Sequence, residues 1–196
     1  MASRGGNQLR IIGGSWRGRR LRFANVPGLR PTSDRNRETL FNWLQPHLHG
    51  SRCLDLFAGS GALGFEGASR GAAHVLLVER AAAAARQLKE NIRILEAGDR
   101  VRLHRGDAIA LLKGPPPSSP FDLVFLDPPF DDALLPRACA LLEHGGWLAP
   151  EALIYLEFRH GNTEPELSAH WHIHRQRVAG QVAYRLMHRG EPPTAL

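Results

Sequence analysis

The middle of the chain alternates between short apolar runs and segments with helical spacing. The apolar runs predict strands at residues 52–57, 75–79, 101–104, 121–126 and 153–158. The segments between them predict helices at residues 63–70, 81–97, 108–113 and 134–143. Repeated strand–helix units of this kind form a mostly parallel sheet with helices on both faces. The pattern therefore predicts an α/β fold.

The N-terminal part follows a different pattern. Residues 9–12 and 19–23 are two strand-like runs around a Gly- and Arg-rich turn, which predicts a β-hairpin with Trp16 near its tip. A turn at residues 30–34 ends in helix-capping residues and leads into a helix that ends near Leu48.

The C-terminal part predicts a second hairpin. Residues 171–178 and 181–188 are strand-like and split by an Ala-Gly pair, so we expect them to pair antiparallel at the sheet edge and complete seven strands. We therefore divide the chain into a basic β-hairpin arm at residues 1–30, a sheet domain at residues 31–190 and a flexible tail at residues 191–196.

The net charge of +6 is unevenly distributed. Residues 1–38 carry nine arginines and two acids, whereas the remaining 158 residues hold 16 basic and 17 acidic side chains. A cationic segment on a near-neutral body is typical of an arm that binds a polyanion, a solvated charged face being the alternative. The residues that we assign to binding of the polyanion, which the family resemblance given below implies to be RNA, are Arg10, Trp16, Arg17, Arg19, Arg20, Arg22, Arg30 and Arg35.

The composition argues against several other classes. No apolar run approaches the roughly 18 residues of a membrane span, and the N-terminus lacks the apolar stretch of a secretory signal, so we expect a cytoplasmic protein. Cys53 and Cys139 lack metal-site spacing, and we interpret both as buried reduced thiols. His170, His172 and His174 alternate without a carboxylate or cysteine partner, so we expect no metal site. The chain length favours a monomer.

A glycine-rich loop follows the strand predicted at residues 52–57. Gly59, Gly61 and Gly64 match the G-x-G-x-x-G spacing, which lets the backbone turn sharply and approach a nucleoside ligand. Glu79, at the end of the next strand, can accept both hydroxyls of a ribose. The residues that we assign to cofactor binding are Asp55, Phe57, Ala58, Gly59, Ser60, Gly61, Glu79, Arg80, Asp107 and Ala108.

Acidic residues distinguish between two nucleoside cofactors, a nicotinamide dinucleotide and S-adenosylmethionine. Asp55 would repel a pyrophosphate, but it suits the ammonium and sulfonium groups of S-adenosylmethionine. Asp107 can accept a hydrogen bond from an adenine amino group, although Asp is also a common helix cap. Together with Glu79 and Asp127, these residues lie at the ends of four successive strands and should form one acidic rim. The rim favours S-adenosylmethionine.

Asp127, Pro128, Pro129 and Phe130 directly follow the predicted strand at residues 121–126. The Asp127 carboxylate and the Pro128 carbonyl can accept hydrogen bonds from the two protons of a planar amino group. Proline fixes φ and has no N–H, so the turn is rigid and no donor competes with the amine. Phe130 can stack on a flat ring. These four residues are our candidate catalytic residues, an ordinary strand-to-loop turn being the alternative.

Four segments resemble the bacterial small-subunit ribosomal RNA guanine-N2 methyltransferase family. They are residues 9–19, 29–44, 55–64 and 127–130, and the similarity extends over nearly the whole chain. The resemblance implies a Rossmann-like class I methyltransferase fold and S-adenosylmethionine as cofactor. It also implies methylation of the exocyclic N2 of a guanine, with small-subunit ribosomal RNA or its ribonucleoprotein particle as the partner.

The resemblance further implies that the helix from Asp34 helps to close over the cofactor. Arg35, Arg37 and Glu38 are the candidates for this role, with solvated helix charges as the alternative.

Other activities share parts of these signals. An amino-methyltransferase for adenine N6 or for a protein glutamine would carry the same Pro-Pro-aromatic loop, so the substrate class depends on the basic arm and on the resemblance. A nucleotide-dependent oxidoreductase would be stabilised by NADH rather than by S-adenosylmethionine. A catalytically silent RNA-binding assembly factor is a third possibility, against which the intact acidic rim argues.

Overall fold

The computed structural model describes residues 7–26, 32–129, 133–161, 165 and 167–190. The predicted roles of Arg30 and Phe130 and the predicted tail at residues 191–196 lie outside the described residues. No helix in the described part of the chain is long and apolar enough to cross a membrane.

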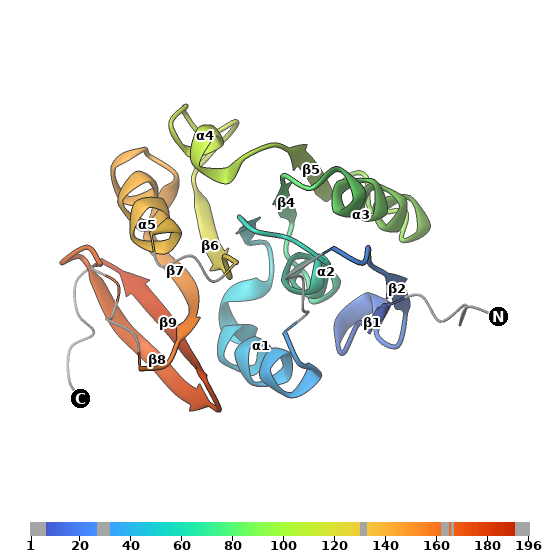
Figure 1. Ribbon diagram of the computed structural model, residues 1–196, viewed down its shortest axis with the longest axis horizontal. Helices are drawn as coiled ribbons and strands as arrows, with labels where there is room; N and C mark the ends of the chain where they lie inside the picture. Colours follow the sequence, from blue (N-terminus) through green and yellow to red (C-terminus); the bar gives the residue numbers. More distant parts are fainter. Residues whose placement is uncertain (1–6, 27–31, 130–132, 162–164, 166, 191–196) are drawn as a thin grey trace.

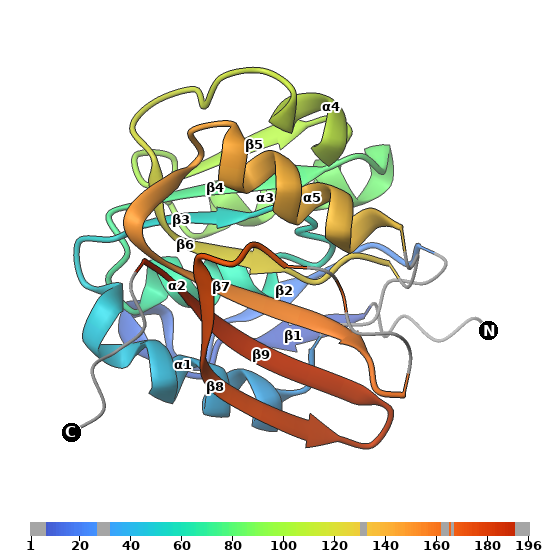
Figure 2. The same cartoon turned by 90° about the vertical axis from the view of Figure 1, so that its left-hand side faces the viewer.

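A seven-stranded sheet runs through the molecule in the order β5-β4-β3-β6-β7-β9-β8 (Figure 1). Its parallel strands are β5 (Val101–Arg105), β4 (His74–Glu79), β3 (Arg52–Asp55), β6 (Phe121–Leu126) and β7 (Leu148–Arg159). β9 (Val182–Arg189) pairs antiparallel with β7, and β8 (Trp171–Ala179) forms the outer edge. Figure 2 shows these three strands side by side. The predicted sheet and its C-terminal hairpin are confirmed.

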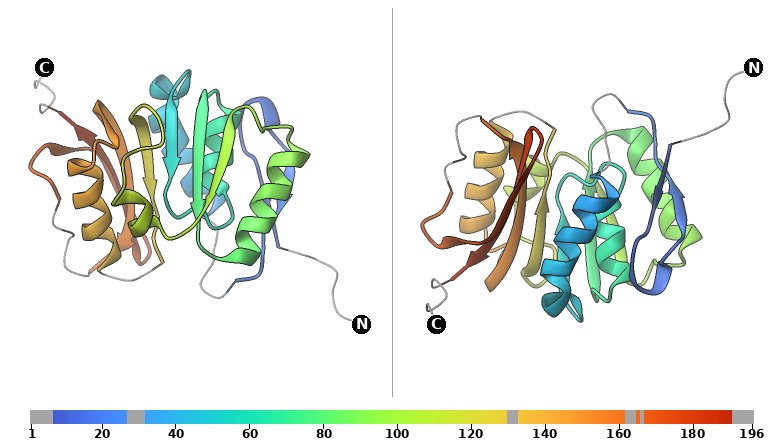
Figure 3. Two further views of the ribbon diagram at one scale, coloured as in Figure 1. Left: turned by 90° about the horizontal axis from the view of Figure 1, so that it is seen from above. Right: turned by 90° about the horizontal axis from the view of Figure 1, so that it is seen from below.

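Helices cover both faces of the sheet (Figure 3). One face carries α1 (Asp34–Leu48), α2 (Ala62–Ser69) and α3 (Ala82–Ile94), and the other carries α4 (Ala108–Leu112) and α5 (Leu134–His144). The burial of β6 explains its run of apolar residues after Asp122, because Leu123 and Phe125 enter the first core while Val124 and Leu126 enter the second.

The N-terminal hairpin packs against the body instead of extending from it. β1 (Gln8–Arg10) and β2 (Arg20–Arg22) pair antiparallel, and a 3-10 turn at Gly14–Trp16 follows β1. Leu9, Ile11 and Leu21 are buried in the core that also contains α1 and α2. Figure 1 shows the hairpin beside α2.

Trp16 does not lie at an exposed tip. Its side chain is 8% exposed, its backbone N–H donates to Ser69 Oγ at 2.9 Å, and the Arg100 guanidinium lies 4.9 Å from its ring centroid. The assignment of Trp16 to RNA binding is therefore wrong, because its ring is already covered by the protein. The backbone N–H of Trp16 fixes the hairpin turn to the end of α2.

Two predicted boundaries differ from the structure by three residues or more. β7 begins at Leu148, five residues earlier than predicted, because Leu148 pairs with Phe121 ahead of a register shift in the β6–β7 ladder. α3 ends at Ile94, and Glu96 then adopts a left-handed conformation with φ of 51° that stops the helix.

Candidate active site at the carboxyl ends of the strands

Five acidic side chains lie at the carboxyl ends of the five parallel strands. In sheet order they are Asp107 after β5, Glu79 in β4, Asp55 in β3, Asp127 after β6 and Glu157 in β7. The chain leaves β3 towards β4 and returns to the other side at β6, and such a reversal opens a crevice above the strand ends. Glu157 was missed by the sequence analysis, although the strand-end rule that selected the other four acids also applies to it.

Asp55 is a buried carboxyl at the centre of this rim, 3% exposed. Its pKa is raised to about 7, mainly by burial; the hydrogen bond from the backbone N–H of Gly64 opposes the increase, and the charge of Glu79 adds a smaller contribution to it. That bond measures 2.9 Å to Asp55 Oδ2. Gly64 must lack a side chain, because a Cβ there would lie 2.2 Å from Cδ2 of Leu77. A cation bound next to Asp55 would therefore favour the ionised form of this carboxyl group.

Glu79 holds the glycine loop against the end of β4. Its Oε2 accepts from the backbone N–H of Gly59 at 2.9 Å, and its Oε1 accepts from that of Ala81 at 2.6 Å. Gly59 and Gly61 have φ of 51° and 78°, a region that other residues rarely adopt. The ribose contact predicted for Glu79 stays a prediction.

The remaining residues assigned to the cofactor surround this loop. Asp107 is exposed, and its Oδ1 caps α4 by accepting from the backbone N–H of Ala110 at 2.9 Å. Asp107 therefore caps a helix, which is the alternative role that its sequence position suggested. Its hydrogen bond to an adenine amino group stays a prediction. Of the others, Ala58, Ser60, Gly61 and Ala108 are buried, Phe57 is partly buried, and Arg80 is exposed at the end of β4.

Asp127 belongs to a hydrogen-bonded group that joins three parts of the chain. The Thr32 hydroxyl, just before α1, lies 3.5 Å from Asp127 Oδ2 and 3.3 Å from Glu157 Oε1. The Tyr155 hydroxyl donates to the same Glu157 oxygen at 2.7 Å. Burial, followed by the charges of Glu157 and Asp55, raises the pKa of Asp127 well above its usual range. In the turn after Asp127, Pro128 is buried and Pro129 is exposed.

The start of α1 is fixed against the β7–β9 side of the site. Asn36 Nδ2 donates to the Tyr184 hydroxyl at 2.5 Å, and Arg177 Nη1 donates to Thr39 Oγ1 at 3.1 Å. The Tyr184 ring stacks on that of Tyr155 with 6.4 Å between centroids. These contacts place the N-terminal turn of α1 next to the acidic rim.

Arg37 does not face the site. Its side chain is 1% exposed, and it donates to the carbonyl of Arg10 at 2.8 Å and to Glu66 Oε2 at 3.4 Å. The expectation that Arg37 helps to close over the cofactor is therefore wrong, because its guanidinium points to α2 and the hairpin. Arg35 and Glu38 are exposed on α1.

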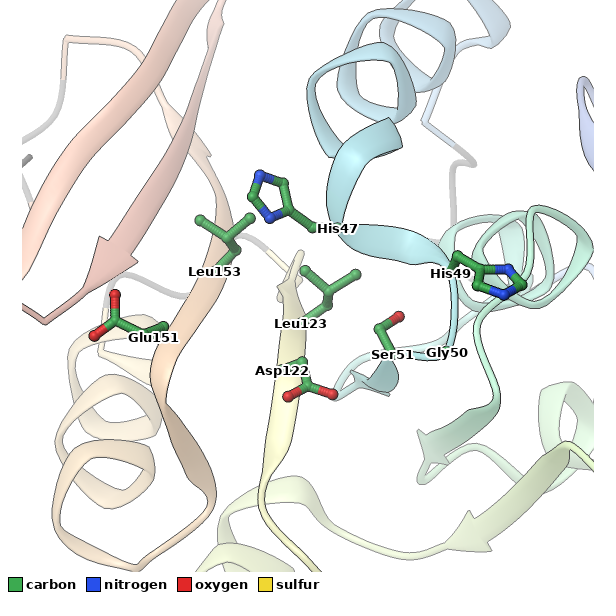
Figure 4. A pocket seen from close by; sticks show the side chains of 8 residues that line it. All are labelled: His47, His49, Gly50, Ser51, Asp122, Leu123, Glu151 and Leu153. Carbon is green, nitrogen blue, oxygen red and sulfur yellow. The ribbon is translucent and has the colours of Figure 1, made fainter.

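A separate hollow of about 300 Å³ lies at the opposite end of the strands. Figure 4 shows it between the end of α1 and the beginnings of β3 and β6, with Ser51, Asp122 and Glu151 on its walls. It faces away from the acidic rim. Among the described residues, no group of three or more His, Cys, Asp or Glu side chains is placed to hold a metal ion.

The strand order, the glycine loop and the acidic crevice are those of a class I methyltransferase, an enzyme that takes its methyl group from S-adenosylmethionine. The chain belongs to the family described as Conserved hypothetical protein 95, whose model matches residues 9–188.

Relatives and solved structures agree with this assignment. The chain is 52% identical over 187 residues to Ribosomal RNA small subunit methyltransferase D of Escherichia coli (strain K12), covering 94% of this chain and 92% of that protein. The protein of the same name from Haemophilus influenzae is 45% identical, with 91% and 93% covered. The structure of a putative methyltransferase, yhhF, from Escherichia coli superposes with a TM-score of 0.88 at 48% identity, covering 94% of this chain and 99% of that one.

Proposed function

We propose that this protein transfers a methyl group from S-adenosylmethionine to the exocyclic N2 of a guanine in small-subunit ribosomal RNA. The observation that carries the proposal is the Asp127-Pro128-Pro129 turn at the switch point of the sheet, next to the buried carboxyl of Asp55. The substrate class is supported by the names of the relatives and by the basic outer face of the hairpin. Such an enzyme would work in the cytoplasm, and we expect it to be a monomer.

The residues of the crevice fit S-adenosylmethionine by their charge. Carboxylates attract a cationic ligand and repel a pyrophosphate, so Asp55 would bind the ammonium and sulfonium end while Glu79 would accept from the ribose hydroxyls. S-adenosylmethionine supplies an electrophilic methyl group whose leaving group is a neutral thioether. The glycine loop between these two acids lets the backbone approach the ligand closely.

At the reacting end, Asp127 and Pro128 would hold the amine. The lone pair of a guanine N2 is delocalised into the ring, so the nitrogen is a poor nucleophile. Hydrogen bonds from its two protons to the Asp127 carboxylate and to the Pro128 carbonyl favour a more tetrahedral nitrogen and align it for in-line displacement. Alignment of this kind contributes several kcal/mol to catalysis. Phe130 is expected to stack on the base.

RNA would bind to the outer face of the hairpin. Arg10, Arg20 and Arg22 alternate with the buried Leu9 and Leu21, so the three arginines share the exposed face. The neighbouring Arg17 and Arg19 in the turn are also exposed. The guanine must leave its stack to reach Asp127, which costs a few kcal/mol and less in an unpaired loop.

The test of the proposal is transfer of a labelled methyl group to small-subunit ribosomal RNA that lacks its native modifications. Free RNA and protein-bound particles serve as parallel substrates, and the product is analysed as nucleosides. We expect N2-methylguanosine. Labelled N6-methyladenosine would instead identify an adenine methyltransferase. If the protein binds S-adenosylmethionine but transfers no methyl group to either substrate, a ribosomal substrate is excluded.

Replacing two exposed arginines of the hairpin should weaken RNA binding in a salt-dependent way. For Arg17→Ala combined with Arg20→Ala, we expect the slope of log affinity against log salt to fall by roughly 0.7–0.9 per lost phosphate contact. Point variants are preferable to deletion of residues 1–22, because Leu9, Ile11 and Leu21 belong to the core. Arg137→Ala, on the exposed side of α5, is the control. Equal slopes for both variants would refute the RNA-binding face.

Cofactor binding should depend on pH through Asp55. Because the pKa of Asp55 is about 7 in the free protein and a cationic ligand binds its ionised form, affinity should fall as pH decreases below about 7, by at most about tenfold per pH unit. Asp55→Asn should bind weakly with little pH dependence. Calorimetric titrations between about pH 5.5 and 8 measure both, and a flat wild-type profile would contradict this role.

A further inference from the structure

Glu157 and Asp127 are neighbours across two paired strands. In the parallel ladder of β6 and β7, Leu126 lies opposite Leu156. Asp127 and Glu157 are the next residues of the two chains, so their carboxyl groups lie side by side at the crevice. Asp127 has a proposed role in catalysis, whereas Glu157 has none in the mechanism described so far.

The hydrogen bonds distinguish between the two carboxyl groups. Glu157 Oε1 receives the Tyr155 hydroxyl at 2.7 Å and lies 3.3 Å from the Thr32 hydroxyl, while Asp127 Oδ2 lies 3.5 Å from that same hydroxyl. A threonine hydroxyl has only one proton to donate, and its shorter distance is to Glu157. The hydroxyl donors therefore favour Glu157 as the ionised member of the pair.

Two carboxyl groups this close and this poorly solvated do not ionise together easily. Burial raises the pKa of Glu157, opposed by the hydrogen bonds from Tyr155 and Thr32. Burial and the Glu157 charge raise the pKa of Asp127, with the Asp55 charge adding to them and the Thr32 hydroxyl opposing. Asp127 thus holds the shared proton to a higher pH, which means that its carboxylate is an unusually strong base.

We propose that Glu157 acts through Asp127 as a positioning residue: its carboxylate, held by the Tyr155 and Thr32 hydroxyls, makes Asp127 the proton acceptor of the methyl transfer. This inference rests on the proposed function. As the bond between nitrogen and methyl carbon forms and the carbon–sulfur bond breaks, the nitrogen becomes positively charged. Asp127 takes one proton from it, leaving a neutral methylated amine, and later releases this proton to water.

The sheet register identifies other titratable or charged side chains near Glu157 that could affect the titration of Asp127. Glu157, Tyr184 and Arg177 form one row across β7, β9 and β8. Arg177 donates to Thr39 on α1, and Asp55 adds a second negative charge from β3 on the far side of Asp127. Because these groups are unchanged in a Glu157 variant, a change in the titration of Asp127 would report the Glu157 charge.

The experiment compares Glu157→Gln, Glu157→Asp and Glu151→Gln with the wild-type protein. Glu157→Gln keeps the shape and can still accept both hydroxyls, Glu157→Asp restores the charge, and Glu151 is an exposed glutamate on the same strand. The first readout is the titration of the Asp127 carboxyl carbon by NMR in the cofactor-free protein. The second is the pH profile of single-turnover methyl transfer.

For Glu157→Gln we expect the Asp127 titration and the acidic limb of the rate profile to move together to lower pH, by about one unit. The plateau rate should also fall, by up to about tenfold, because a weaker base accepts the proton. Glu157→Asp should move both midpoints back, and Glu151→Gln should change neither. An unchanged Asp127 titration in a folded Glu157→Gln protein would overturn the proposal. Because this readout needs no RNA, a wrong substrate assignment would not disguise the result.

Discussion

Asp127→Ala is expected to abolish most methyl transfer while leaving cofactor affinity nearly unchanged. The variant removes the acceptor that would hold one amine proton and, in our further proposal, the base that removes it. Loss of one such preorganised polar group lowers the catalysed rate by about 10²–10³-fold. Because Asp55 and Glu79 would bind the cofactor, the loss should appear in the single-turnover rate and not in the dissociation constant of S-adenosylmethionine.

Two further variants make this expectation specific. Asp127→Asn keeps the size of the side chain but replaces one acceptor oxygen by a donor, so its rate should also fall. Asp122→Asn lies on the same strand at its opposite end, where Asp122 accepts from the backbone N–H of Arg52 at 2.8 Å. It should leave the methyl-transfer rate close to that of the wild type. Full turnover by Asp127→Ala would show that the Pro-Pro turn is only a structural turn.

The sheet and most of its strand ends could be predicted because their signals are local. The prediction of β6 at residues 121–126 is confirmed at both ends, because five of its six residues are apolar, as is typical of a parallel strand buried on both faces, and a proline turn follows it. Four of the five rim acids followed from one rule, that residues after successive parallel strands meet at one edge of the sheet. Glu157 obeys the same rule and was missed because no known motif drew attention to it.

The position of the hairpin could not be predicted, because it depends on contacts between residues far apart in the sequence. An arginine-rich turn containing one tryptophan is typical of an exposed loop, yet the Trp16 ring is covered by Arg100, 84 positions later. Arg37 is similar, since an arginine near the start of an amphipathic helix usually faces solvent. Here it is buried, because the hairpin covers that part of α1 and α2.

Glu66 explains how the hairpin is held in place. It is fully buried in α2, and its Oε2 and Oε1 accept from the backbone N–H groups of Ile12 at 2.9 Å and Gly13 at 2.7 Å. The same carboxylate pairs with Arg70 at 2.7 Å and with Arg37 at 3.4 Å. One carboxylate therefore joins the hairpin, α1 and the helix that follows the glycine loop.

Glu66→Ala is therefore expected to destabilise the protein strongly and to loosen the hairpin. The variant leaves two guanidinium groups and two backbone N–H groups without their shared acceptor, and breaking a buried ion pair in this way costs about 3–5 kcal/mol. Urea unfolding measures this loss. If the protein remains folded under the assay conditions, RNA affinity should fall more than the affinity for S-adenosylmethionine, because the arginines of the hairpin lose their fixed position before the crevice does.

Two control variants distinguish the loss of the buried Glu66 carboxylate from the loss of an ordinary glutamate on a helix surface. Glu66→Gln can still accept the two backbone N–H groups, so its loss of stability should be smaller than that of Glu66→Ala. Glu90→Ala removes an exposed glutamate of α3 that pairs with Arg93, and it should change neither stability nor RNA binding appreciably. If Glu66→Ala were as stable as Glu90→Ala and bound RNA equally well, the hairpin would be held by its apolar contacts alone. Glu66 would then have no part in presenting the arginines to RNA.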